Sequence, residues 1–425
     1  MSFGYNEDLL QFIWEFQLYQ NDKLITTSGK EIRILKQGFL NNNSGPDFEN
    51  CEVKIGSETF YGSIEIHIDS KDWEHHNHHL DPSYNNVVLH VCYSGNKTAL
   101  RQDGTAIPTL YLENKIDDRA LVKYKRLMED KPFIPCQNQL SELSSFDVVI
   151  WVERMIVERL ESRCHSYKKY LNQSNNHWNQ AFFTAICRTF GMPVNSEAFE
   201  EIAAQLPFDI VQKHNKSLFQ LEALFFGVSG LLQHNTEDNY CIGLQSEYAF
   251  LKKKYGLKEI STRVKLGRMR PMNLPHIKIA QLAALFHHIP QFISSVLSLP
   301  PTKEIQKLLD FQLSDYWSTH YSFGKASKPK SKKISAGFID HLFLNAIVPF
   351  VFFYEKEKMT IDSNKAMEYL RALKSEKNSI ISNWKSMGVS SENALSSQAL
   401  LHLYKTYCLP KKCLQCSLGK KILNQ

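Results

Sequence analysis

The spacing of apolar and polar residues predicts a mixed module over the first 95 residues. Apolar side chains recur at helical spacing in 7–20, which predicts a buried helix. The polar stretch 70–86 has room for one short helix. The order of helix, strands, short helix and strand predicts an α/β or α+β module of about 120 residues. Strands are expected at 24–27, 31–35, 51–55, 59–69 and 87–93, the last of them apolar on both faces.

From residue 146 onward the pattern changes to helical periodicity, and strand signals almost vanish. Pro132, Pro135 and the polar residues 141–145 mark the boundary. The sequence therefore predicts an α+β protein with a β-rich domain over 1–140 and an all-α region over 141–425. Helices are expected at 147–170, 178–190, 196–206, 216–232, 276–289, 337–354 and 391–407.

Charge is distributed unevenly between these two parts, at −6 over 1–140 and +12 over 141–425. An acidic module joined to a basic one suits a metal–carboxylate site beside a phosphate-binding surface, although solvated surface charge explains the same numbers. The acidic N-terminus lacks the apolar run of a signal peptide, and the apolar stretch 342–354 is short for a membrane span. Scattered cysteines suit a reducing compartment. We therefore expect a cytoplasmic protein with no membrane partner.

The segment IEIHID, residues 64–69, alternates strictly between apolar and polar residues. On a strand this alternation places Glu65 and His67 on one face. Asp47 enters the preceding strand of the same hairpin, so folding of the hairpin brings Asp47 near Glu65. Two carboxylates on adjacent strands suit a hard divalent cation. A half-exposed strand whose polar face meets water is the alternative interpretation.

Asp47 followed by Glu65-x-His67, behind an N-terminal helix, resembles the core of the PD-(D/E)xK nucleases, which have a restriction-endonuclease-like αβββαβ module. The resemblance implies that Asp47 and Glu65 hold Mg²⁺ or Mn²⁺. Lysine is usual in that family where His67 stands, so His67 or a neighbour such as Lys54 would assist the attacking water. Some members add a glutamate from the first helix, for which Glu15 is the candidate.

Six of the sixteen histidines lie between His67 and His90. Imidazole and carboxylate groups together suit Zn²⁺, Mn²⁺ or Fe²⁺. A helix across this run would place His75 and His79 on one face, and with Asp81 they form a further candidate metal set. A polar surface loop and a core histidine at position 90 are the alternatives.

Three cysteines near the C-terminus are spaced C-x4-C-x2-C, at Cys408, Cys413 and Cys416. Thiolates at these separations can share one metal, and the spacing equals the three-cysteine part of a plant-type iron–sulfur pattern. Certain PD-(D/E)xK nucleases hold an iron–sulfur cluster with one upstream cysteine and three near the C-terminus, a layout similar to this one. Zinc, iron–sulfur and free thiols all stay open, and the candidates for a fourth ligand are His402, Cys136, Cys164 and Cys187.

Nucleic acid is the expected partner of the basic helical region. Trp317 and its aromatic neighbours precede the basic loop 325–333, which suits base stacking, although a packed aromatic core explains them as well. The candidates for phosphate contacts are Arg268, Arg270, Lys325, Lys330, Lys332 and Lys333.

Nearly the whole chain also resembles an uncharacterised bacterial family, a domain of unknown function, in segments such as NSGPDF, YWSTHYSFGK and YCLPKKCLQCSLG. That resemblance implies no activity. The leading hypothesis from the residues is a metal-dependent nuclease. The alternatives are a non-catalytic scaffold that binds nucleic acid or protein around a structural metal, and a zinc or iron hydrolase of a small molecule.

Overall fold

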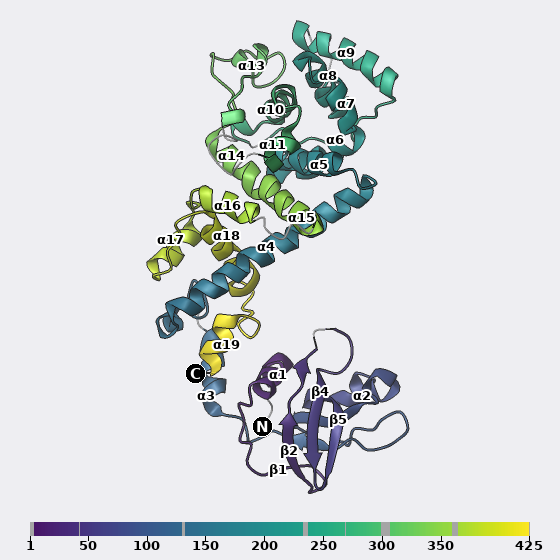
Figure 1. Cartoon of the computed structure of the whole chain (residues 1–425), viewed down its shortest axis with the longest axis vertical. Helices are drawn as coiled ribbons and strands as arrows, with labels where there is room; N and C mark the ends of the chain where they lie inside the picture. The colour runs from purple at the N-terminus through teal and green to yellow at the C-terminus, as the bar shows by residue number, and fades with distance from the viewer. Residues whose placement is uncertain are drawn as a thin grey trace. The chain divides into compact units, whose positions relative to one another are not determined.

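A computed structural model describes residues 4–41, 43–129, 132–232, 237–267, 269–298, 307–358 and 364–424. The chain divides into two compact units. The first unit contains Met1–Trp151 together with Leu403–Gln425, and the second contains Val152–His402. The predicted α+β class is confirmed, because an N-terminal sheet region precedes a largely helical one (Figure 1).

The first unit is built on a seven-stranded sheet with the order β1-β2-β4-β5-β6-β7, in which β3 pairs with β4. Neighbouring strands are antiparallel up to β5, whereas β6 runs parallel to β5 and β7 runs parallel to β6. The strands are β1 (Leu24–Ile25), β2 (Glu31–Lys36), β3 (Phe39–Leu40), β4 (Phe48–Ile55), β5 (Glu58–Asp69), β6 (Val87–Ser94) and β7 (Thr109–Tyr111).

Two glycines fix how β5 joins its neighbours. Gly56 has a φ of 63° in the tight turn between β4 and β5, a conformation that glycine adopts without strain. Gly62 lies so close to the chain entering β6 that a Cβ atom there would be 2.3 Å from the carbonyl oxygen of Asn86. The absence of a side chain at position 62 therefore allows the parallel β5–β6 pairing.

Short helices cover both faces of this sheet. Figure 1 shows α1 (Glu7–Glu15) and α2 (Asp72–His75) on either side of β4 and β5. Helix α1 ends earlier than predicted, and Gln17 just after it has a φ of 54°, outside the helical range. The remaining elements of the unit are η1 (His78–Leu80), η2 (Pro82–Tyr84), α3 (Asp118–Glu129), η3 (Gln137–Glu142), the start of α4 (Ser145–Gln173), η6 (Tyr404–Cys408) and α19 (Ser417–Asn424).

Strand β5 is buried on both faces in its second half, where residues 63–67 are all buried. The interpretation of this strand as half-exposed is therefore wrong: its polar face is covered by the segment that follows it. Trp73 anchors that segment by packing with Val87, Ala99 and Ile107 in a small core of its own. Its indole Nε1 donates a hydrogen bond of 2.9 Å to the carbonyl oxygen of Leu100.

The second unit is helical and has a core rich in phenylalanine, with Phe183 packed edge-on against Phe286 and Phe182 tilted against Phe350. Its elements, after the rest of α4, are α5 (Trp178–Phe190), α6 (Met192–Gln205), α7 (Phe208–Lys213), α8 (Leu218–Val228), α9 (Asn239–Tyr255), η4 (Pro271–Asn273), α10 (Pro275–His288), α11 (Phe292–Ser298), α13 (Tyr316–Thr319), α14 (Ala336–Leu342), η5 (Phe343–Ile347), α15 (Val348–Lys358), α16 (Lys365–Ala372), α17 (Ser379–Ser386) and α18 (Ala394–Leu403).

One helical stretch of the described residues, Ala336–Lys358, is long and apolar enough to cross a membrane by length and composition. It contains the apolar run 342–354 and extends beyond it on both sides. However, 67% of its most apolar window is buried inside the protein, as in a core helix.

We expect Trp73→Ala to loosen the cover of β5, because a large cavity replaces the indole and the hydrogen bond to Leu100 is lost. Such substitutions destabilise by about 3–5 kcal/mol. Amide hydrogen exchange over residues 58–94 measures the effect in the full chain. The control is Tyr61→Ala, since Tyr61 on β5 is 73% exposed and its removal should change little. Equal protection in the two variants would contradict the role given to Trp73.

Candidate metal centre

Two polar side chains lie in the middle of the first unit, on the face of β5 that the segment after it covers. Glu65 is 5% exposed and His67 is fully buried. The parallel register pairs Glu65 with His90 and His67 with Cys92. The pleat of the two strands therefore brings all four side chains to the same face.

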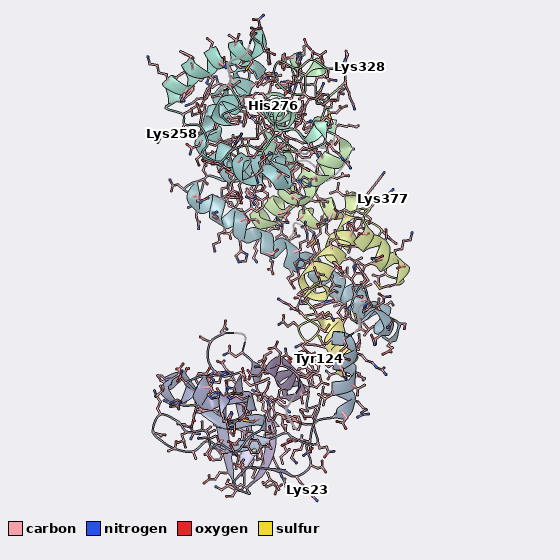
Figure 2. All side chains as sticks on the ribbon, turned by 180° about the vertical axis from the view of Figure 1, so that it is seen from behind. Lys23, Tyr124, Lys258, His276, Lys328 and Lys377 are labelled. Carbon is pink, nitrogen blue, oxygen red and sulfur yellow. The ribbon has the colours of Figure 1, made fainter. Side chains whose placement is uncertain are left out.

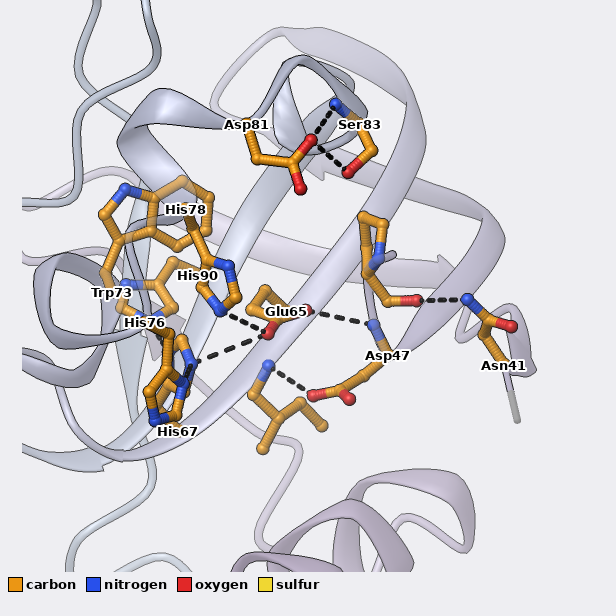
Figure 3. Close-up of polar contacts among 12 residues, drawn as sticks. Asn41, Asp47, Glu65, His67, Trp73, His76, His78, Asp81, Ser83 and His90 are labelled. Carbon is orange, nitrogen blue, oxygen red and sulfur yellow. Dashed lines mark hydrogen bonds and ion pairs between the residues drawn. The ribbon is translucent and has the colours of Figure 1, made fainter. Parts of the chain in front are cut away.

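Three imidazole rings gather over this face. The side chains of His67, His76 and His78 each offer a ligand atom, and these atoms lie within 4.8 Å of one another. Nδ1 of His76 is 3.2 Å from Nε2 of His67. Oε1 of Glu65 is 3.5 Å from Nε2 of His67 and 3.2 Å from Nε2 of His78. Three nitrogen atoms and one carboxylate oxygen thus face one small volume (Figure 3).

The backbone after α2 places His76 and His78 beside Glu65 and His67. Asn77 lies between them in the left-handed conformation, with a φ of 61°, which asparagine tolerates better than most residues. The chain therefore turns back over β5 instead of continuing as a helix. The ring of His78 stacks on Tyr84 at 3.8 Å and meets the edge of Trp73 at 5.4 Å, so packing fixes its orientation.

A buried neighbour orients His67. Nδ1 of His67 lies 2.9 Å from Nε2 of His90, and this hydrogen bond leaves Nε2 of His67 facing Glu65 and His76. Nε2 of His78 is also buried, and although it lies 3.2 Å from Oε1 of Glu65 it makes no hydrogen bond within the described part of the chain. An imidazole fixed through its far nitrogen, and another with an unsatisfied inward nitrogen, fit the ligand set of a divalent metal.

Asp47 holds Glu65 from the adjacent strand. Its backbone N–H donates a hydrogen bond of 3.0 Å to Oε2 of Glu65. Its own carboxylate accepts hydrogen bonds from the backbone N–H of Ile66 at 3.0 Å and from Nε2 of Gln11 at 2.9 Å. The structure therefore brings Asp47 and Glu65 together at the mouth of the hairpin, while their carboxylates contact different partners.

Burial favours the neutral form of four titratable groups in and beside this cluster: Glu65, Asp47, His67 and His90. It raises the pKa of Glu65 to about 8 and, together with the charge of Glu65, that of Asp47 to about 7. Burial also lowers the pKa of His67 to about 2 and of His90 to about 3. Neutral imidazoles are ready to bind a metal, and a cation beside the acids would stabilise their ionised forms.

The sequence did not single out Glu7, the third acid beside this cluster. Burial, followed by the charges of Asp47 and Glu65, raises its pKa to about 8. The predicted acid of α1, Glu15, instead forms an ion pair of 3.1 Å with Lys420. The spacing offered a signal, because Glu7 lies four residues before Gln11 and so shares a helix face with the side chain that bonds Asp47.

The second predicted histidine set is not assembled. Helix α2 ends at His75, so His75 and His79 do not form the pair expected from a longer helix. His75 is exposed and lies 3.3 Å from Asp72, while His79 is outside the group of three. Asp81 caps η2, where it accepts hydrogen bonds of 2.9 Å and 2.7 Å from the N–H and hydroxyl of Ser83.

The residues of the second unit predicted to contact phosphate differ in their exposure to solvent. Nζ of Lys332 is buried and donates to the carbonyl oxygen of Ser318 at 2.9 Å, and Nζ of Lys333 lies 2.8 Å from Asp310.

The other basic candidates, Arg270, Lys325 and Lys330, are exposed. Figure 2 labels their neighbour Lys328 at the surface of the same unit. Arg268 lies outside the described residues.

The candidate ligands near the C-terminus lie in different units. Cys408, Cys413 and Cys416 are buried in the first unit. His402 belongs to the second unit, where its Nε2 lies 3.1 Å from Glu158.

The pKa values predict how pH changes stability. Glu65 binds its proton more tightly in the folded protein than in the unfolded chain, so stability falls as pH rises toward about 8. His67 and His90 are neutral in both states above about pH 6.5 and do not offset this loss. We expect the chelator-treated protein to lose ~2 kcal/mol between about pH 6.5 and pH 8.5 from Glu65 alone. Thermal unfolding with and without Zn²⁺ measures it: added Zn²⁺ should abolish the loss, and a loss unchanged by the metal argues against a cation at Glu65.

Comparison with known proteins places the chain in a family. The family described as "Protein of unknown function (DUF2851)" matches residues 7–379. No curated protein and no solved structure shows significant similarity to the chain. These comparisons add no support to the nuclease resemblance of the N-terminal module. Because the match covers most of the sequence, the chain belongs to the DUF2851 family of proteins of unknown function.

Proposed function

We propose that this protein is a metal-dependent hydrolase of phosphodiester bonds in nucleic acid. The observation that carries the proposal is the convergence of the buried Glu65 and His67 with His76 and His78 on one point beside Asp47. Imidazole ligands favour Mn²⁺, Zn²⁺ or Fe²⁺ over Mg²⁺. Glu65 is one of the two acids that the nuclease resemblance implies as metal ligands.

The chain's own residues would divide the work. His67, His76, His78 and Glu65 would hold the cation, which when bound lowers the pKa of a water molecule and stabilises charge on a phosphate. The N–H of Asp47 keeps Glu65 in position. The carboxylate of Asp47, with a pKa of about 7, suits a group that accepts a proton near neutral pH.

The order of the elements also supports a nuclease. Helix α1, strands β2, β4 and β5, the short helix α2 and the parallel strand β6 follow the αβββαβ order that the resemblance implies. Asp47 lies just before β4, and Glu65 lies on β5. The acid from the first helix would be Glu7 in place of Glu15.

A structural metal in a non-catalytic scaffold is the second candidate. Three imidazoles and one carboxylate fill the tetrahedral shell of zinc, as in closed structural sites. The additional acids favour catalysis, because burial and the charge of Glu65 raise the pKa of both Glu7 and Asp47. Clusters of titratable groups with shifted pKa values occur more often at functional sites than at structural sites.

Cleavage of labelled single- and double-stranded DNA and RNA, with Mn²⁺, Zn²⁺, Fe²⁺ or Mg²⁺ added to chelator-treated protein, tests the hydrolase. We expect Glu65→Gln, Asp47→Asn and His76→Ala each to lower the rate at least ~100-fold. His75→Ala is the matched control, since this exposed neighbour of His76 lies outside the cluster.

Two outcomes would reject the hydrolase. Cleavage that Glu65→Gln and Asp47→Asn leave unchanged would come from another enzyme in the preparation. Tight, stoichiometric zinc binding without cleavage of any of the four substrates would favour the structural metal instead.

The exposed lysines of the second unit predict a salt-dependent contact with nucleic acid. We expect Lys325→Ala combined with Lys330→Ala to weaken binding of a DNA or RNA strand and to reduce the salt slope by ~1 for each phosphate contact that is lost. Fluorescence anisotropy at several salt concentrations measures both quantities. Lys377→Ala, at an exposed lysine elsewhere in this unit (Figure 2), is the control. An unchanged slope in the double variant would remove this loop from the interface.

A further inference from the structure

Four cysteines of the first unit are buried near one another although two of its chain segments supply them. They form the four-cysteine group: Cys136, Cys408, Cys413 and Cys416. Each exposes less than a tenth of its surface, and none is in a disulfide. Cys136 comes from the loop before η3, whereas the other three come from the C-terminal segment that returns to this unit.

The C-terminal turn is folded tightly around its three cysteines. Helix η6 ends at Cys408, Lys411 takes a left-handed φ of 56°, and the N–H of Cys416 bonds to the carbonyl oxygen of Cys413 at 3.2 Å. A Cβ atom on Gly419 would lie 2.2 Å from that same carbonyl oxygen. The sequence Cys-Ser-Leu-Gly therefore allows α19 to start directly against the cysteine turn.

Aromatic packing brings the loop of Cys136 to this turn. The ring of Phe133 stacks on Tyr404, with centroids 4.6 Å apart and planes within 8°. The two chain segments of the unit also contact each other through α3 and α19, which lie side by side in Figure 1. The electrostatics agree with this placement. After burial, the causes that raise the pKa of Cys408 are the other three cysteines of the group.

Three N–H groups surround the sulfur of Cys416. Cys416 directly precedes α19, and the backbone N–H groups of Leu418 and Gly419 donate to its sulfur. Burial raises the pKa of Cys416, and the indole N–H of Trp151, directed to the same sulfur, opposes this rise together with the two backbone groups. N–H groups at a helix start stabilise a thiolate, and N–H···S bonds of this kind surround metal-bound cysteine sulfurs.

The spacing of the sulfurs distinguishes one metal ion from a cluster. A tetrahedral zinc site with Zn–S bonds of about 2.3 Å needs sulfur atoms ~3.8 Å apart. Within the described residues, the three histidines are the only group of three or more such ligand atoms that all lie within 4.8 Å of one another, so no three of the four cysteine sulfurs lie that close together. In a 4Fe–4S cluster each of the four thiolates binds a different iron, which holds all four sulfurs further apart.

We propose that Cys136, Cys408, Cys413 and Cys416 hold a 4Fe–4S cluster. Cys136 is the fourth ligand that the C-x4-C-x2-C spacing lacks. The cluster links two segments that are far apart in sequence, and so fastens the C-terminal segment to the sheet-containing unit. This site is separate from the histidine cluster and does not depend on the hydrolase proposal.

The full chain, purified without oxygen and reconstituted with ferrous iron and sulfide, tests the cluster. We expect about four iron and four sulfide per chain, a visible charge-transfer band that dithionite bleaches, and an electron paramagnetic resonance signal of the reduced cluster. Cys136→Ser should lose iron and the band. Cys164→Ser, at a half-buried cysteine of the second unit, should keep both.

A third variant tests the cluster even if Cys136→Ser does not fold. Trp151→Phe keeps an aromatic ring but removes the N–H directed to Cys416, so the cluster should assemble with a lower reduction potential. One zinc per chain in place of iron, or no metal after reconstitution of a folded protein, would overturn the proposal. Glu65→Gln should leave the iron content unchanged even if it removes cleavage, so the two proposals fail independently.

Discussion

The burial of Glu65 and His67 in the middle of a sheet is the constraint on which the arrangement of the first unit depends. A carboxyl and an imidazole removed from water need partners, since unpaired buried polar groups cost several kcal/mol. Asp47 supplies an N–H to Glu65, and His90 supplies a ring nitrogen to His67. The inward nitrogens that remain face one another, and a cation is the partner that would satisfy them together.

The segment between β5 and β6 creates this burial. A crossover between parallel strands is commonly a long helix, but here it is one helical turn and two short 3-10 turns. Trp73 supplies the apolar contact that such a short segment needs, and Asn77 supplies the reversal of the chain. The same residues that close the core therefore also position His76 and His78.

The buried carboxylate of Glu222 in the second unit is satisfied within that unit. Glu222 is fully buried, and its carboxylate accepts hydrogen bonds from the indole of Trp317 at 3.1 Å and from the hydroxyl of Ser314 at 3.0 Å. Trp317 is itself buried against Phe226, so it cannot stack on a base in this fold. Its aromatic cluster is core that supports the basic loop, whose outer lysines stay exposed.

The sequence by itself determined the fold class, most of the strands and long helices, and the proximity of Asp47 to Glu65, because these follow from local periodicity and from hairpin geometry. It also marked residues 67–90 as rich in metal ligands. Only the tertiary structure decided that His76 and His78, rather than His75 and His79, join His67. It also decided that Glu7, rather than Glu15, is the acid of α1 whose pKa is raised by burial and by the charges of Asp47 and Glu65, and that the C-terminal cysteines lie beside Cys136. The physical reason is that these features depend on packing across the whole unit. They are the left-handed conformation of one residue, the length of a short helix and the return of a distant chain segment. The spacing of residues along the sequence does not report such packing.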